Sequence, residues 1–209
     1  MRDFLLSSPW PGTVAWAVIY ISDFIFTITC ARLYRRNLAD RIVFEGSFEL
    51  NPLFQRDVDS MKYWSPRFLL ALVLTSTLIA IEWALLVPDS TGFYIFLIGA
   101  MICVQLANHV RHLANLHLFS SRLLTDQLRG RIEYARPLIL RMSSVQFLGF
   151  TILFAVVFAF TRSWFVAGGI FSCFLISLKH WYLAHRAAEK RAAKGKEVVQ
   201  VLASSASSN

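Results

Sequence analysis

The stretch Arg67–Leu86, RFLLALVLTSTLIAIEWALL, contains a single basic and a single acidic residue and decides the fold class. At a rise of about 1.5 Å per residue, an α-helix of this length crosses the hydrocarbon core of a bilayer, which is about 30 Å thick. Ser65 and Pro66 precede the stretch, and these residue types are favoured at the N-cap and the first helical position. The pattern predicts a transmembrane helix opened by Ser65-Pro66.

Other apolar stretches of similar length lie on both sides of this one. The predicted spans cover about residues 14–33, 67–86, 93–118, 142–160 and 164–183. The chain is 56% hydrophobic and 16% charged, whereas soluble domains contain about 25% charged residues. We therefore expect an all-α polytopic membrane protein. Residues 14–186 would form a five-transmembrane-helix bundle, with the plasma (inner) membrane as the expected location.

The basic residues predict an orientation for this bundle. All Lys and Arg residues except Arg2 and Arg162 lie in or beside the connection of spans one and two, around the connection of spans three and four, or toward the C-terminus from Lys179 onward. Because cytoplasmic segments are enriched in Lys and Arg, the N-terminus is expected outside and the C-terminus inside. Residues 1–13 would be an extracytoplasmic tail, 34–66 and 119–141 cytoplasmic connections, and 187–209 a basic, disordered tail. The net charge of +8 follows from this rule, so no nucleic-acid partner is expected.

The two cytoplasmic connections share a short pattern. Residues 42–50 and 126–134 each contain Gly-x-(Phe/Ile)-Glu-(Leu/Tyr), in which Gly46 and Gly130 are equivalent. Alternating apolar residues around a glycine are typical of a β-hairpin, so a small hairpin is predicted in each connection. The pattern is explained either by duplication of a helix–hairpin–helix unit or by chance similarity of two short turns.

A short amphipathic helix is expected after Asn51-Pro52. Phe54, Val58 and Met61 recur at helical spacing and would share one face. Such a helix would lie on the inner membrane surface before the chain enters span two.

Polar side chains inside the spans are the candidate functional residues, since a charged group there costs about 2.5–3.5 kcal/mol on insertion scales. Asp23 lies near the middle of span one, and Gln105 and Asn108, at similar depth, are its expected partners. Two readings of Asp23 stay open, a proton or cation site and a hydrogen bond within the bundle. The complete set of intramembrane candidates is Asp23, Gln105, Asn108, His109, His112, Asn115, Lys179 and His180.

The histidines allow one cofactor hypothesis. His109 and His180 are expected at equal depth in different spans, as bis-histidyl ligation of haem b requires. Hydrogen bonding of the histidines to the cytoplasmic carboxylates Glu45, Glu49 and Glu133 explains their positions as well. No metal-type spacing occurs, so neither a cofactor nor a metal is predicted.

Small residues on span five predict a close helix contact. Gly168, Gly169 and Ser172 form a small-xxx-small surface, which lets two helix backbones approach each other. The contact is expected either within the bundle or between copies of the chain.

No catalytic motif is present, so the biochemical role stays undetermined from the sequence and an enzyme is not favoured. The leading expectation is a non-enzymatic oligomer or membrane-complex component whose basic cytoplasmic platform meets anionic lipid headgroups or other membrane subunits. One alternative is an oligomeric ion or proton channel or transporter that uses Asp23 and the polar stripe of span three. The other is an enzyme at the membrane interface.

Overall fold

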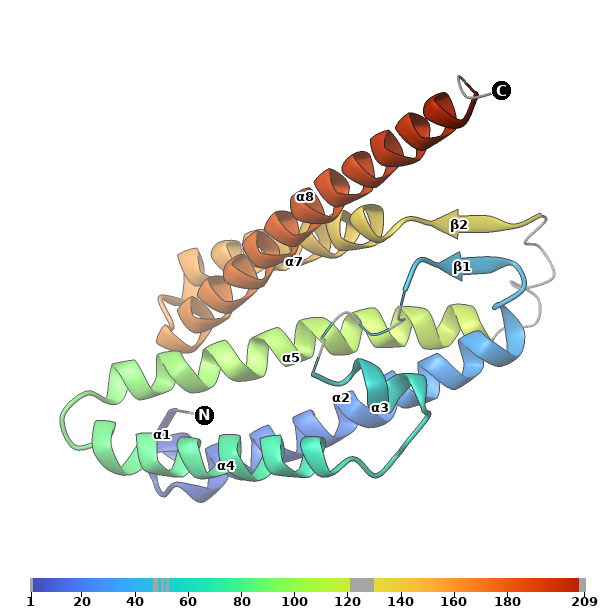
Figure 1. The fold of residues 1–209 in the computed structure, drawn as a ribbon. Helices are drawn as coiled ribbons and strands as arrows, with labels where there is room; N and C mark the ends of the chain where they lie inside the picture. Colours follow the sequence, from blue (N-terminus) through green and yellow to red (C-terminus); the bar gives the residue numbers. More distant parts are fainter. Residues whose placement is uncertain (1, 47–48, 50, 52, 121–129, 207–209) are drawn as a thin grey trace.

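Five helices in the computed structural model of the chain are long and apolar enough to cross a membrane. They are α2 (Trp10–Asn37), α4 (Pro66–Leu86), α5 (Thr91–Ser120), α7 (Arg136–Thr161) and α8 (Trp164–Ala206) (Figure 1). The structure describes residues 2–46, 49, 51, 53–120 and 130–206, the last thirteen of these by backbone alone. The prediction of a mainly helical, multi-pass membrane protein is confirmed.

The helices extend beyond the predicted spans at both termini. The short helix α1 (Arg2–Leu6) and the first turn of α2 occupy the segment expected to be a tail. α8 continues to Ala206, where the sequence predicts disorder after residue 186. The physical reason is composition, because residues 187–200 are rich in Ala, Lys and Glu, which favour helix strongly.

Helix α5 is the central element of the bundle and contacts α2, α4 and α8. Its contact with α8 depends on glycine: a Cβ added at Gly168 would collide with the carbonyl oxygen of Phe96, and one at Gly99 with that of Phe165. Gly169 lies against the side chain of Cys103 in the same contact. The small residues of span five therefore serve close packing within the bundle.

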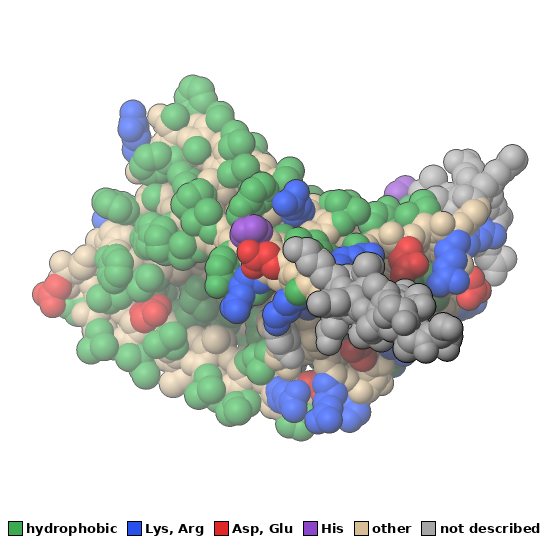
Figure 2. All heavy atoms as spheres, turned by 45° about the horizontal axis from the view of Figure 1, so that its top comes forward, with side chains coloured by type: hydrophobic (Ala, Val, Ile, Leu, Met, Phe, Trp, Pro, Cys, Tyr) green, Lys and Arg blue, Asp and Glu red, His purple; other side chains and the backbone are tan. Residues whose placement is uncertain are grey.

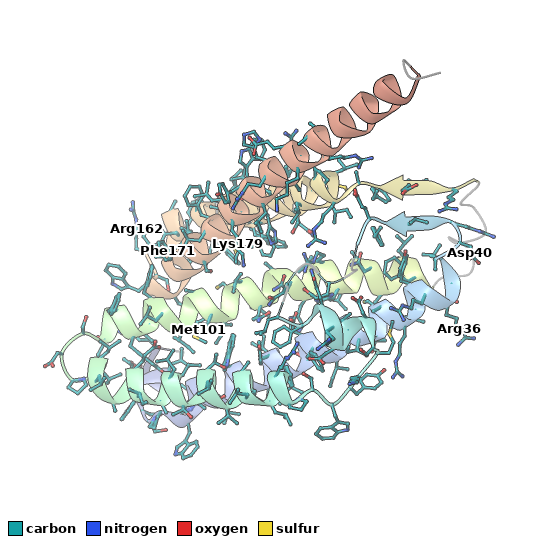
Figure 3. The ribbon with its side chains drawn as sticks, in the orientation of Figure 1. Arg36, Asp40, Met101, Arg162, Phe171 and Lys179 are labelled. Atoms are coloured by element: carbon teal, nitrogen blue, oxygen red, sulfur yellow. The ribbon has the colours of Figure 1, made fainter. Side chains whose placement is uncertain are left out.

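The two ends of the bundle differ. We call the end with the α4–α5 and α7–α8 turns (residues 87–90 and 162–163) the turn end, and the opposite end, at residues 38–46 and 130–135, the strand end. Figure 3 shows Arg162 at the turn end and both Arg36 and Asp40 at the strand end. On the face drawn in Figure 2, hydrophobic side chains cover the part toward the turn end, and most Lys and Arg side chains lie toward the strand end.

The described strands join the two connections to each other. β1 (Ile42–Phe44) pairs in parallel with β2 (Ile132–Tyr134), with Ile42 opposite Ile132 and Phe44 opposite Tyr134. The pairing is thus between the connections, whereas the sequence predicts a hairpin within each of them. The remaining parts of those hairpins include residues 47, 48, 50 and 126–129, which lie outside the described residues.

The two strands occupy different positions in the shared pattern. β1 precedes Gly46, whereas β2 follows Gly130, and both glycines have a positive φ. The strands are therefore not equivalent under the proposed duplication. Tyr34 holds β1 against the bundle, because its hydroxyl donates a hydrogen bond to the carbonyl oxygen of Ile42 at 2.7 Å.

The amphipathic segment forms the five-residue helix α3 (Gln55–Asp59). Val58 is buried and packs with Phe54 and Met61 against α2 and α4, so the three residues share one face as predicted. The predicted start of α4 is confirmed, since Ser65 is the N-cap and its hydroxyl accepts a hydrogen bond from the backbone N–H of Phe68. The same hydroxyl donates to Asp57 at 2.6 Å and ties α3 to α4.

We expect Gly168→Ala to destabilise the protein by about 1–3 kcal/mol, because the added methyl group forces α5 and α8 apart. Gly149→Ala on α7 is the matched control, since nothing lies within 4 Å of its Cβ position and alanine favours helix. Thermal unfolding of the purified variants in detergent measures the difference. Equal melting temperatures for the two variants would contradict the proposed role of Gly168.

Candidate functional site

A cavity of about 430 Å³ lies among α2, α5 and α8 and contains most of the predicted intramembrane candidates. We call it the polar chamber. The hydrophilic residues that line it come from three helices and from the segment after β1: Tyr20, Asp23, Thr27, Glu49, Asn51, Gln105, Asn108, Arg111, His112, Lys179 and His180. Chain segments far apart in sequence thus place their polar side chains at one site.

Asp23 lies beside two histidines of α5. Its Oδ1 atom is 3.3 Å from Nε2 of His112 and 3.9 Å from Nδ1 of His109. Gln105 and Asn108, the partners expected from the sequence, instead hydrogen-bond to each other at 3.1 Å. The observed arrangement places the carboxyl group of Asp23 next to two imidazole rings of α5.

The ring of His112 is held from one side. Thr27 donates its hydroxyl to the carbonyl oxygen of Asp23 at 2.9 Å, and its oxygen lies 3.2 Å from Nε2 of His112. Because this hydroxyl already donates, Nε2 of the imidazole supplies the hydrogen in the second contact. The side chain of His112 is 4% exposed, and its Nδ1 atom has no hydrogen-bond partner among the described residues.

His109 has both ring nitrogens engaged. Nδ1 donates to the carbonyl oxygen of Gln105 at 2.7 Å, and Nε2 lies 2.7 Å from the hydroxyl of Ser22. His180 instead contacts Ser143 on α7 through Nδ1 at 2.9 Å. The two rings thus have separate partners, and the donor set of His109 does not fit the bis-histidyl haem hypothesis.

A second, larger cavity of about 720 Å³ adjoins the polar chamber and shares Glu49, Arg111 and His112 with it. We call it the wedge cavity because it lies between α5 and α7 and is closed at the strand end by β1 and β2. Its other lining residues are mainly apolar: Ile42, Phe44, Ala114, Asn115, Leu118, Phe119, Tyr134, Ile139, Arg141, Met142, Ser143, Val145 and Gln146.

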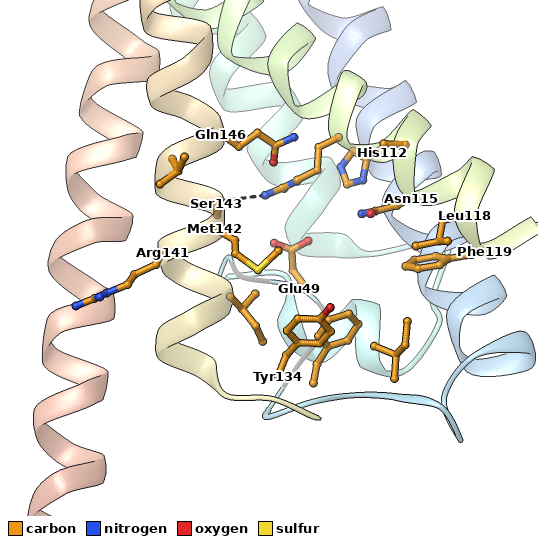
Figure 4. Close-up of a pocket in the computed structure, with 16 residues that line it drawn as sticks. Glu49, His112, Asn115, Leu118, Phe119, Tyr134, Arg141, Met142, Ser143 and Gln146 are labelled. Carbon is orange, nitrogen blue, oxygen red and sulfur yellow. Dashed lines mark hydrogen bonds between the residues drawn. The ribbon is translucent and has the colours of Figure 1, made fainter. Parts of the chain in front are cut away.

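Charged groups lie at the deep end of the wedge cavity, where it meets the chamber. Figure 4 shows the carboxylate of Glu49 pointing away from the ring of Tyr134 and toward the level of His112 and Ser143. Arg111 donates to the hydroxyl of Ser143 at 3.3 Å, the hydrogen bond drawn in the figure. The wedge cavity therefore has a charged inner end and an apolar, partly aromatic body.

Glu49 is the candidate whose titration is most clearly altered. Burial raises the pKa of Glu49. Two effects lower it: the backbone N–H of Asn51 donates to Oε1 at 2.6 Å, and Arg111 and His112 act electrostatically on the carboxylate. Desolvation outweighs these contacts because the carboxylate loses water and lies close to Asp23 as well.

The other predicted carboxylates lie outside the site. Glu45 accepts hydrogen bonds from the backbone N–H of Arg136 at 2.9 Å and from Arg191 at 3.0 Å, which links β1 to α7 and α8. Glu133 is exposed on β2, opposite Val43. Of the three, only Glu49 reaches the cavities among the described residues.

Sequence reasoning missed two contributors to the site. Arg111 was counted only among the basic residues around the connection of spans three and four, and Ser143 was not singled out. The signal for Arg111 was its position within a span among Asn108, His109 and His112, all of them polar. For Ser143 the available signal was the adjacent pair with Ser144, two hydroxyls in an apolar helix. Ser144 exchanges hydrogen bonds with Ser177 of α8.

Comparisons with models of known protein families, with curated proteins and with solved structures found no match to this chain. The function is therefore argued below from the geometry of the two cavities.

We expect Glu49→Gln to become more stable relative to the wild type as the pH rises above about 4.5. The folded state holds the proton of Glu49 more tightly than the unfolded state, so the wild type loses stability as the pH rises through the raised pKa. Glutamine keeps an acceptor for the backbone N–H of Asn51 and does not ionise. Melting temperatures between pH 4.5 and 8 measure the effect.

Glu133→Gln is the control, because that side chain is exposed on β2. A stability difference for Glu49→Gln that does not change with pH would show that the carboxylate of Glu49 is not desolvated.

Proposed function

We propose that this protein is a non-enzymatic membrane component that binds an amphipathic molecule in the wedge cavity. The observation that carries the proposal is the cavity's composition, an apolar body that ends at Glu49, Arg111 and His112. Its volume of about 720 Å³ lies within the range of about 300–1,000 Å³ in which protein pockets hold small ligands.

The position of the cavity supports a ligand that arrives from the bilayer. Met142 and Val145 line it, and both side chains are largely exposed on α7. In a membrane, that flank of α7 faces lipid chains, which are too apolar to compete for the charged inner end. An amphiphile could enter sideways between α5 and α7, with its polar group leading.

Among the described residues, the cavity at the turn end is much smaller, about 140 Å³. Trp16, Ile79 and Tyr94 pack with neighbouring isoleucines there, and the close contact of α5 with α8 lies beside them. Within the described residues, the polar chamber and the wedge cavity thus both lie on the strand-end side of this packing. With the predicted orientation, the ligand would come from the inner leaflet, where basic connections would meet anionic headgroups or other subunits.

We expect Val145→Trp to reduce binding of the amphiphile by filling the wedge cavity, into which Val145 projects. Native mass spectrometry of the protein, extracted in mild detergent, would show an adduct of lipid-like mass on the wild type and a smaller fraction on the variant. Extraction of the adduct then identifies it.

Val156→Trp is the matched control. It lies on the same face of α7 three turns away, does not line the cavity, and is 52% exposed compared with 62% for Val145. A wild-type protein without an adduct, or equal adducts on both variants, would overturn the proposal.

Transport is the second candidate, favoured by the pair of Asp23 and His112 at 3.3 Å. A carboxylate beside an imidazole within a span can exchange a proton, and a water-accessible chamber at this depth is typical of a coupling site. The closed turn end means that such transport would require a second conformation or an assembly of several copies.

Asp23→Asn would abolish proton or cation flux in liposomes while leaving the melting temperature nearly unchanged, because asparagine keeps the shape of the side chain. Asp59→Asn, on α3, is a control outside the predicted spans. Flux that is unchanged in Asp23→Asn would exclude a coupling role for this carboxylate.

A further inference from the structure

Arg111 has fewer protein acceptors than a half-buried guanidinium normally requires. It offers five N–H donors, yet in the described part of the chain its side chain makes a single hydrogen bond, to Ser143 at 3.3 Å. The residue lies within α5 and borders both cavities. Because a poorly paired charge inside a membrane is costly, the position favours an acceptor that the chain itself does not supply.

His112 provides a second donor site at the same place. Its Nε2 atom is engaged by Thr27 and Asp23, whereas Nδ1 is buried and has no hydrogen-bond partner among the described residues. The ring forms part of the wall of the wedge cavity (Figure 4). When both ring nitrogens carry hydrogen, Nδ1–H is a donor for which the described residues supply no acceptor.

The neighbouring charges also favour an anion. Burial raises the pKa of Glu49, so this carboxyl is easier to keep neutral than an exposed one and then leaves the charge of Arg111 uncompensated. Lys179 adds a further positive charge in the adjoining chamber, whose acidic residues are Asp23 and Glu49. The groups that act electrostatically on Glu49 are Arg111, His112 and Asp23.

We propose that Arg111 and His112 bind the anionic headgroup, a carboxylate or a phosphate, of an amphiphile whose apolar chain lies in the wedge cavity. The inference rests on the proposed function and adds the charge of the ligand to it. A planar guanidinium matches both oxyanions with paired hydrogen bonds. The aromatic rings of Phe44, Phe119 and Tyr134 line the part that would hold the chain.

Binding to the wild-type protein tests the charge without any substitution. The full chain is placed in nanodiscs of phosphatidylcholine, and saturable binding of radiolabelled hexadecyl phosphate and palmitate is measured at pH 6.5 and at pH 8 against empty nanodiscs. Hexadecanol, with the same chain length and no charge, should compete about tenfold less well than the better of the two anions, since it lacks the charge that strengthens a hydrogen bond from Arg111.

Comparison of the two anions distinguishes a phosphate headgroup from a carboxylate, and preference for either supports the inference. Hexadecanol competing as well as the anions, or no saturable binding of either anion, would overturn it. Loss of the adduct in Val145→Trp together with equal competition by hexadecanol would leave the proposed function standing without the anionic ligand.

Two arginines of the wedge cavity allow a matched substitution test. Arg141 also lines the cavity, but its guanidinium lies over the ring of Trp181, 5.4 Å from the centroid, and Figure 4 shows it pointing away toward α8. Arg111→Gln should weaken binding of the preferred anion about tenfold and leave hexadecanol unaffected, while Arg141→Gln should leave both unchanged. Equal weakening by both substitutions would overturn the assignment of Arg111.

Discussion

The contact between α5 and α8 at Gly99 and Gly168 is the constraint on which the shape of the bundle depends. Because these glycines have no side chain, the backbones of α5 and α8 are in direct contact there, and no water or ligand can pass between the two helices. Toward the strand end, the polar chamber lies between the same helices, lined by Asn108 and Arg111 of α5 and by Lys179 and His180 of α8. The bundle is therefore tight at one end and open at the other, which explains why both polar cavities lie beyond the glycine contact.

The open half is closed at its end by chain segments from the two connections. The parallel pair of β1 and β2 spans the distance between α2 and α7, and Glu45 ties β1 to the start of α7 and to α8. Glu49, which follows β1 in the sequence, lines the same two cavities as Arg111. Glu49, Arg111, His112 and His180 thus line the same chamber inside the bundle. Water screens charges less there than at the surface, so each charge strongly affects its neighbours.

Several features could be predicted from residues that act locally. The apolar stretch at 67–86 predicts a span, Ser65-Pro66 predicts its start, and Gly168 and Gly169 predict a close helix contact; the structure agrees with all three. The positions of Asp23 and His112 along their helices marked them as candidates, and both line the polar chamber. The partner of Asp23 was not predictable, because helical depth does not tell which side of α5 faces α2.

Other features depend on contacts between distant parts of the chain. Residues 42–44 and 132–134 have the alternation of strands, but a local pattern favours a hairpin and cannot reveal a parallel partner 90 residues away. Arg111 contributed only to the orientation prediction, because its position in the sequence is near the end of a span. By itself, the sequence determined that five helices cross a membrane, since hydrophobic length is a local property. The tertiary structure decided that Glu49, Arg111 and His112 meet at one cavity, because that depends on how the helices separate beyond their glycine contact.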